Sequence, residues 1–165
     1  MRKIVLLGYM GSGKTTVAQK LSKIINIPVV DLDIAIETKT QLSINQIFEK
    51  HGEIYFRKLE REVFVDLLQS AEDKIISLGG GTPCYSNNHE LLMQDDIISI
   101  YLRASVETLY ERLKDKKAKR PLLSGKDADE LKEFIAKKMF ERSFYYNQAK
   151  YKVDVDDKSI DDTVV

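Results

Sequence analysis

Residues 4–15 of this chain, which decide its fold, read Ile4-Val5-Leu6-Leu7-Gly8-Tyr9-Met10-Gly11-Ser12-Gly13-Lys14-Thr15. The stretch opens with four consecutive apolar residues, a pattern typical of a strand that is buried on both faces of a parallel sheet. A glycine-rich turn follows at once, and over residues 15–25 apolar side chains recur at helical spacing. The stretch therefore predicts a buried strand, a tight turn and the first turns of a helix.

The turn at residues 8–15 fits the phosphate-binding pattern GxxxxGK(S/T). Its glycines let successive backbone N–H groups point at phosphate oxygens, and the helix that follows directs the positive end of its dipole at the same anion. We expect Lys14 to reach the β- and γ-phosphates of a nucleotide and the Thr15 hydroxyl to bind Mg²⁺. A turn that only reverses the chain is the alternative, and the strand-to-helix context argues against it. The residues expected to contact the nucleotide here are Gly11, Ser12, Gly13, Lys14, Thr15 and Thr16.

Strand and helix patterns alternate along the rest of the chain. Further strands are predicted at residues 28–30, 75–78, 97–102 and 151–155. Helices are predicted at residues 33–50 (one or two helices, with Ser43 as a cap), 56–67, 86–93, 106–113 and 127–149, and residues 159–165 are expected to begin a final helix that stops early. The alternation predicts an α/β fold, a three-layer αβα single domain of residues 1–165 around a central parallel sheet of five strands.

The composition excludes several classes of protein. A length of 165 residues suits one domain with a substantial core. The 26 basic side chains balance the 26 acidic ones, so no charge bias indicates a nucleic acid or an anionic membrane. No stretch approaches the roughly 20 apolar residues that span a bilayer, and the apolar run near the N-terminus is too short for a signal peptide. We therefore expect a cytoplasmic protein, a monomer, with no nucleic-acid or membrane partner.

Two carboxylates, Asp31 and Asp33, stand at the end of the second predicted strand. Ligands of open α/β sheets bind beyond the carboxyl ends of the strands, so both side chains are placed to face the nucleotide. One is expected to hold Mg²⁺ through water and the other to accept the proton of an acceptor hydroxyl. The alternative is that Asp33 caps the next helix and Asp31 has no role.

Arg57 has Glu53 four residues before it and Glu60 three residues after it, so all three share one face of a helix. Spacing alone favours a surface ladder of ion pairs, which is worth little. The functional alternative is a guanidinium that carboxylates hold rigid, so that it grips a substrate carboxylate with two hydrogen bonds.

Arg142 falls on an otherwise apolar stripe of the last long helix. The other members of the stripe are Leu131, Ile135, Tyr146 and Ala149. Because an unpaired charge is costly to bury, Arg142 either faces a ligand or partner or lies at the edge of the stripe. Both alternatives stay open.

Two further segments suggest ligand binding. Gly79-Gly80-Gly81 follows the third strand, and three glycines together suggest either a backbone that approaches a ligand closely or a flexible loop. Residues 111–120 carry six basic and two acidic side chains and end at Arg120. Within residues 112–125 we expect a lid whose arginine closes over the γ-phosphate and excludes water, or else a solvated loop.

In combination these residues resemble the shikimate kinases, small members of the P-loop kinases. Five pieces occur in order: Gly13-Lys14-Thr15, Asp31-Leu32-Asp33, Phe56-Arg57 with Glu60, Gly79-Gly80-Gly81 and Arg120-Pro121-Leu122-Leu123. The first piece marks only the superfamily, and the combination is far more specific. The chain departs from the family at Ser143-Phe144-Tyr145, where proline and leucine are frequent, and at residues 156–158, which lack an arginine often found near the adenine.

The resemblance implies phosphorylation of the 3-hydroxyl of shikimate by ATP, with Mg²⁺ as cofactor, in the biosynthesis of aromatic amino acids. A substrate-binding region at residues 33–61 is implied, with Lys14, Asp33 and Arg120 as catalytic residues. Glu60 would orient Arg57, Arg112 would lie against the adenine, and Thr15 and, through water, Asp31 would hold Mg²⁺. The residues implied to bind shikimate are Asp33, Arg57, Glu60, Gly79, Gly80, Gly81 and Arg142. The residues implied to bind ATP include Arg112 and Arg120 besides the glycine-rich turn.

Two other functions compete with this one. A related small-molecule kinase, such as a gluconate kinase, shares the phosphate-binding turn but needs a different acceptor pocket. A non-catalytic nucleotide-binding module needs neither the paired aspartates nor the arginine of the expected lid, and those residues argue against it.

Overall fold

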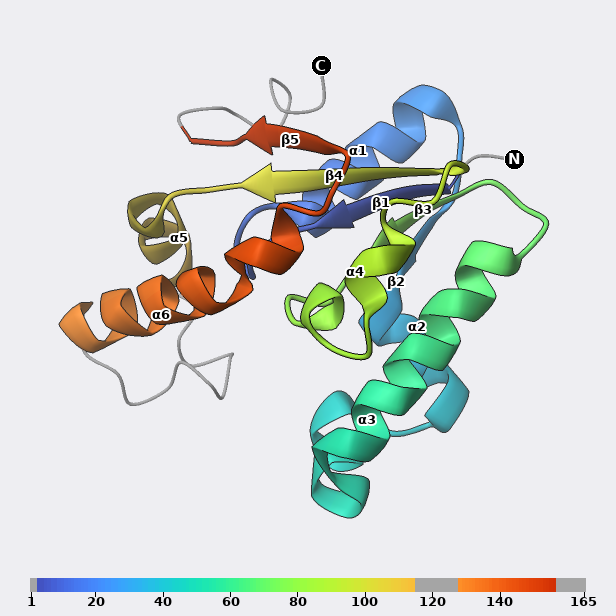
Figure 1. Ribbon diagram of the computed structural model, residues 1–165, viewed down its shortest axis with the longest axis horizontal. Coiled ribbons are helices and arrows are strands. Elements are labelled where there is room, and N and C mark those ends of the chain that lie inside the picture. The colour runs from blue at the N-terminus through green and yellow to red at the C-terminus, as the bar shows by residue number, and fades with distance from the viewer. Residues whose placement is uncertain (1–2, 115–127, 157–165) are drawn as a thin grey trace.

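The computed structural model describes residues 3–114 and 128–156, drawn in colour in Figure 1. Their five strands form one parallel sheet in the order β2-β3-β1-β4-β5. The strands are β1 (Lys3–Leu7), β2 (Val29–Asp31), β3 (Lys74–Ser77), β4 (Ile97–Arg103) and β5 (Tyr151–Asp154). The helices are α1 (Lys14–Ile25), α2 (Leu32–Thr40), α3 (Ile44–Gln69), the short 3₁₀ helix η1 (Thr82–Cys84), α4 (Asn88–Leu91), α5 (Val106–Leu113) and α6 (Ala128–Tyr146). The predicted α/β fold with a five-stranded parallel sheet is confirmed.

The central strand of the sheet is β1, and all five of its residues are buried. Val5 pairs with Ile76 of β3 on one side and with Ser99 of β4 on the other. A strand that is covered on both faces and paired on both edges has no solvent-facing side, which is why its sequence is a continuous apolar run. The turn that follows β1 is therefore carried on the most deeply buried strand of the sheet.

The helical arm of α2 and α3 projects from the β2 side of the sheet (Figure 1). Ser43 begins α3 as predicted, because its side chain accepts a hydrogen bond from the Gln46 N–H in a reciprocal capping box. Gly52 bends the helix with a φ of 83°, and the second half of α3, which carries Arg57 and Glu60, follows the bend. The arm is thus built from two local signals that the sequence carries.

The residue that caps the N-terminus of α2 is Asp31, not Asp33 as one of the sequence-based alternatives had it. Asp31 Oδ1 accepts a hydrogen bond of 3.2 Å from the Ile34 N–H, so Asp31 is the cap and Asp33 lies inside the first turn. The idea that Asp33 caps this helix is wrong, and its carboxylate is left for other contacts.

The segment after β3 is less helical than predicted. In place of a helix over residues 86–93, the chain forms η1 and then α4, which starts only at Asn88. Ser86 and Asn87 adopt left-handed φ values of 54° and 57°, and right-handed helix cannot run through them. The segment lies between α3 and α6 and contacts both (Figure 1).

The stripe of α6 is buried as the spacing predicts, with Leu131, Ile135 and Tyr146 in the core. Residues 115–127, which include most of the expected lid, and the expected final helix at residues 159–165 lie outside the described residues. In the described ranges, no helix combines the length and the apolar character that crossing a membrane requires.

Candidate functional site

The glycine-rich turn joins β1 to α1 at the carboxyl end of the sheet. Gly11 and Gly13 have φ values of 86° and 99°, a left-handed conformation that glycine adopts without strain. A β-carbon on Gly8 would lie 2.8 Å from the Leu102 carbonyl oxygen, so a larger residue does not fit there. No side chain caps α1 at Gly13, which leaves the N–H groups of its first turn available to an anion.

Two cations border the turn. Lys14 Nζ donates to the carbonyl oxygens of Gly8 and Tyr9, the second at 3.2 Å. Arg112 reaches over from α5, and its Nη1 donates to the Gly11 carbonyl oxygen at 3.1 Å. Two of the three predicted nucleotide-binding cations, Lys14 and Arg112, are therefore held against the turn by its own carbonyl groups, with positive charge concentrated where phosphate is expected.

Thr15 and Asp31, the residues predicted to hold Mg²⁺, line the same cavity of about 590 Å³ between α1, α2 and the β2 edge of the sheet. A hydroxyl and a carboxylate are the hard oxygen donors that suit Mg²⁺. Asp31 uses Oδ1 for its helix cap, and Oδ2 is not part of that hydrogen bond. The residues fit an ion that keeps several of its waters, as Mg²⁺ does.

Asp33 lies beside the loop after β3. A β-carbon on Gly79 would stand 3.1 Å from Asp33 Oδ1 and 3.4 Å from Oδ2, so the carboxylate packs against the bare glycine backbone. Burial, together with the nearby carboxylates of Asp31 and Glu60, raises the pKa of Asp33 to about 6 against the opposing charge of Lys14. A carboxylate whose pKa is near neutral is suited to accept a proton.

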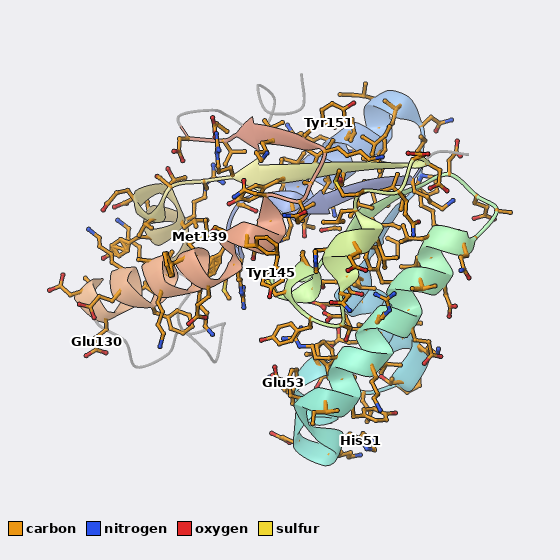
Figure 2. All side chains as sticks on the ribbon, in the orientation of Figure 1. His51, Glu53, Glu130, Met139, Tyr145 and Tyr151 are labelled. Atoms are coloured by element: carbon orange, nitrogen blue, oxygen red, sulfur yellow. The ribbon has the colours of Figure 1, made fainter. Side chains whose placement is uncertain are left out.

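Arg57 is held from three directions. Its Nη1 donates to Glu60 Oε1 at 3.0 Å, and Glu53, which is labelled in Figure 2, lies 3.6 Å from its Nε. The guanidinium also stacks on the Tyr85 ring, 3.8 Å from its centroid. Only 2% of the Glu60 side chain and 17% of the Arg57 side chain are exposed. The surface ladder that spacing favoured is therefore wrong, because spacing carries no information on depth.

Arg142 lies at the inner end of the α6 stripe, and its contacts argue against the alternative that it sits at the solvent edge. Its Nη1 is 3.5 Å from the Tyr146 hydroxyl, and its guanidinium lies over the Tyr9 ring, 5.5 Å from the centroid. The Tyr146 hydroxyl in turn donates to the Gly80 carbonyl oxygen. Arg142 therefore faces the phosphate-binding turn and the loop of residues 79–81, here called the glycine loop, rather than the solvent edge of the helix.

The three consecutive glycines join these side chains into one site. A β-carbon on Gly79 would lie 3.1 Å from Asp33 Oδ1, and one on Gly80 would lie 3.1 Å from Arg142 Nη1. A β-carbon on Gly81 would lie 3.1 Å from Arg57 Nη2. Each glycine thus faces one polar side chain from a different helix, α2, α6 or α3. The alternative of a merely flexible loop does not explain this arrangement.

Arg120, the predicted lid arginine, lies outside the described residues, as do residues 115–125 of the predicted lid. The other predicted site residues fall into two groups, the phosphate-binding turn and the side chains around the glycine loop. The two groups lie side by side, because a β-carbon on Gly80 would lie 3.8 Å from the backbone nitrogen of Met10 in the turn.

Sequence reasoning missed three residues of the site. Thr82 hydrogen-bonds Glu60, Tyr85 stacks on Arg57, and Tyr146, noted only as a member of an apolar stripe, hydrogen-bonds Gly80. Tyr145, its neighbour, is labelled in Figure 2 and turns instead toward α4, where its ring packs 5.2 Å from that of His89. Helical spacing places Tyr146 and not Tyr145 on the apolar stripe, but it carries no sign that the Tyr146 hydroxyl bonds Gly80.

Comparison with known proteins adds independent findings. The family model for shikimate kinase matches residues 10–165. A shikimate kinase from Flavobacterium johnsoniae is 65% identical over 164 residues, which cover 99% of this chain and 95% of that protein. A crystal structure of shikimate kinase from Bacteroides thetaiotaomicron superposes with a TM-score of 0.90 at 35% identity, covering 99% of this chain and 94% of the other.

Shikimate kinase from Acinetobacter baumannii, solved in complex with shikimate, superposes with a TM-score of 0.85 at 32% identity, covering 99% of this chain and 89% of the other. A gluconokinase from Sinorhizobium meliloti also matches, covering 99% of this chain and 87% of the other, at a TM-score of 0.57 and 15% identity. The second likeness concerns the fold alone.

Proposed function

The chain belongs to the shikimate kinase family, and we propose that it transfers the γ-phosphoryl group of ATP to the 3-hydroxyl of shikimate. The products are shikimate 3-phosphate and ADP, in the route to aromatic amino acids. The observation that carries the proposal is the glycine loop, which gathers one carboxylate and two guanidinium groups beside the phosphate-binding turn. These are the groups that a small polyhydroxy acid needs for recognition.

The two arginines would bind the carboxylate of shikimate. A planar guanidinium offers paired N–H donors to a carboxylate, and such pairs fix orientation as well as affinity. Arg57 is already immobilised by Glu60 and Tyr85, so little side-chain entropy is lost when substrate binds. Arg142 supplies a second charge from the opposite side of the loop, where its Nη1 adjoins Gly80.

Asp33 would take the hydroxyl end of the same substrate. It binds the hydroxyls of shikimate and accepts the proton of the 3-hydroxyl as the bond from O3 to the γ-phosphorus forms and the bond to the ADP oxygen breaks. Its pKa of about 6 leaves it mainly ionised at neutral pH and still able to hold a proton. The backbone groups of Gly79 to Gly81 complete this pocket.

The phosphate-binding turn would position ATP. The backbone N–H groups of residues 11–16 hold the phosphates, and Lys14 turns from its carbonyl partners to the β- and γ-phosphates. Thr15 and, through water, Asp31 hold Mg²⁺, which neutralises charge on the phosphates when it is bound. Arg112 lies against the nucleotide from α5, and Arg120 acts on the transferring phosphoryl group.

We also propose that the enzyme acts as a monomer in the cytoplasm. The described side chains assigned above, which are all but Arg120, meet within one copy of the chain, and this supports a monomer. Light scattering after size-exclusion chromatography measures the mass, and 18.9 kDa is expected.

The test is ADP release in the presence of Mg²⁺ and ATP with shikimate, with gluconate and without an acceptor. We expect release with shikimate only, and a product whose phosphorus resonance couples to the proton at C3. Turnover on gluconate without turnover on shikimate would establish the related kinase instead. Nucleotide binding with no transfer to either acid would establish the binding module.

A further inference from the structure

A buried polar network adjoins Arg57 through its partner Glu60. Of the seven polar or charged residues that are buried in the described part of the chain, three belong to it: Glu60, Thr82 and Asn88, at 1%, 0% and 0% exposure. Buried polar groups are costly unless they are paired, so a cluster this deep is maintained by its hydrogen bonds.

The two oxygens of Glu60 have different partners. Oε1 accepts from Arg57 Nη1 at 3.0 Å, and Oε2 accepts from the Thr82 hydroxyl at 2.8 Å. A carboxylate beside a guanidinium otherwise tends to form two parallel hydrogen bonds with it. The Thr82 hydroxyl holds the second oxygen, so Glu60 takes only one edge of the Arg57 fork.

Thr82 is itself held in place. Asn88 Nδ2 donates to the Thr82 carbonyl oxygen at 3.0 Å, and Arg61 Nη1 donates to Asn88 Oδ1 at 3.1 Å and to the Ser86 carbonyl oxygen at 2.7 Å. Glu60 and Arg61 are neighbours on α3, so the loop is fastened to that helix at two adjacent points. The hydroxyl therefore reaches Glu60 from a fixed backbone.

We propose that Thr82 is a positioning residue that keeps the substrate-facing edge of Arg57 open for the carboxylate of shikimate, with Asn88 holding Thr82 in register. This inference rests on the function proposed above. Without the hydroxyl, the buried Oε2 of Glu60 loses its donor and turns toward the guanidinium that already donates to Oε1. Glu60 then competes with the substrate for Arg57, and the affinity for shikimate falls while the ATP site is untouched.

Thr82→Val tests this directly, because valine keeps the shape of threonine and lacks the hydroxyl, and Thr82→Ser is the matched control that restores it. We expect Thr82→Val to raise the KM for shikimate about 5- to 20-fold, with the KM for ATP within twofold of the wild-type value. Thr82→Ser should return the KM for shikimate to within about threefold. An unchanged KM in Thr82→Val, or an equal loss in Thr82→Ser, overturns the proposal.

A second substrate separates positioning from general damage. The methyl ester of shikimate carries no carboxylate charge, so it gains little from an open Arg57 fork. Thr82→Val should therefore change kcat/KM for the ester less than twofold, and a loss as large as that for shikimate contradicts the mechanism. If Thr82→Val does not fold, as judged by circular dichroism, Thr82→Ala replaces it in both assays with the same expectations.

The failure of this inference can be told apart from the failure of the proposed function. Wild-type enzyme that does not phosphorylate shikimate refutes the proposed function. Active wild-type enzyme together with a Thr82→Val variant whose KM for shikimate is unchanged refutes this inference alone.

Discussion

Asp33 and Gly79 face each other so closely that a β-carbon on the glycine would stand 3.1 Å from Asp33 Oδ1. The same β-carbon would lie 3.2 Å from the Thr82 hydroxyl. A methyl group at position 79 would therefore crowd both the Asp33 carboxylate and the Thr82 hydroxyl, to which we assign different roles. The contact also shows why the loop contains glycine here, although the φ of Gly79 lies outside the left-handed region.

Gly79→Ala is therefore expected to push the Asp33 carboxylate away from the 3-hydroxyl. A misplacement of about 1 Å at a reacting group can cost about 100-fold, so a shift of a few tenths of an ångström is expected to lower kcat/KM for shikimate by roughly tenfold. The KM for ATP should remain within twofold, because the phosphate-binding turn is not touched. Steady-state kinetics with each substrate varied in turn give the answer, and unchanged kinetics would show that Asp33 has room to move.

Asp33→Asn should slow catalysis and stabilise the fold at neutral pH. The pKa of Asp33 is about 6 in the folded chain against 3.8 for an exposed aspartate, chiefly because of burial. The folded state therefore holds the proton more tightly, and the stability gained from it is complete below about pH 4 and lost as the pH rises through 6. Asparagine carries no such loss, so at pH 7.5 the variant should be more stable by up to about 3 kcal/mol.

Two measurements check this pair of effects. Urea unfolding at pH 7.5 should favour Asp33→Asn, and the difference in the free energy of unfolding should shrink toward pH 4. In the wild type, kcat/KM for shikimate should fall below a midpoint near pH 6, and kcat of the variant should be at least about 100-fold lower. A loss of less than about tenfold would mean that Asp33 only positions the hydroxyl.

Arg57→Lys should fail to replace arginine even though it keeps the charge. Lysine offers no planar fork to the carboxylate and cannot stack on Tyr85 as the guanidinium does at 3.8 Å. We expect kcat/KM for shikimate to fall by about 100-fold and the KM for ATP to stay within twofold. Lys58→Ala, which removes the exposed cation next in sequence, is the control and should leave both values unchanged. Full activity of Arg57→Lys would show that charge alone suffices.

The parts of the fold that the sequence predicted are those whose signals are local. The run at residues 4–7, the glycine turn and the Ser43 cap depend on neighbours within a few positions, and all are confirmed. The failed predictions concern burial, exact partners and the left-handed residues Ser86 and Asn87, which interrupt the helix expected over residues 86–93. Spacing put Arg57 and Glu60 on one helix face but carried no sign that Glu60 is buried at the junction with the glycine loop.

The missed residues have partners far away in the sequence. Thr82 bonds a carboxylate 22 residues before it, and Tyr146 bonds a carbonyl group 66 residues before it. No periodicity within one helix or strand records such a contact. The glycine triplet was the local signal of this loop, because glycine is needed where three side chains from other elements crowd the same backbone.

Tyr146→Phe tests whether this distant contact supports the site. Burial raises the pKa of Tyr146 well above its usual range, so the hydroxyl stays protonated and donates to the Gly80 carbonyl oxygen. Phenylalanine keeps the packing against the Tyr101 ring, 5.2 Å away between centroids, and leaves the carbonyl group without that donor. We expect a loss of about 1–2 kcal/mol in the free energy of unfolding. The KM for shikimate should rise several-fold, because Arg142 Nη1 also loses the hydroxyl that lies 3.5 Å from it.

Tyr145→Phe is the matched control for this variant, because Tyr145 contacts His89 and Phe144 through its ring, which phenylalanine retains. Denaturant unfolding and kinetics on both variants should show a change in Tyr146→Phe only. If the two variants lose stability equally, the hydrogen bond to Gly80 contributes nothing specific. If Tyr146→Phe loses stability but keeps its KM for shikimate, the hydroxyl supports the loop without positioning Arg142.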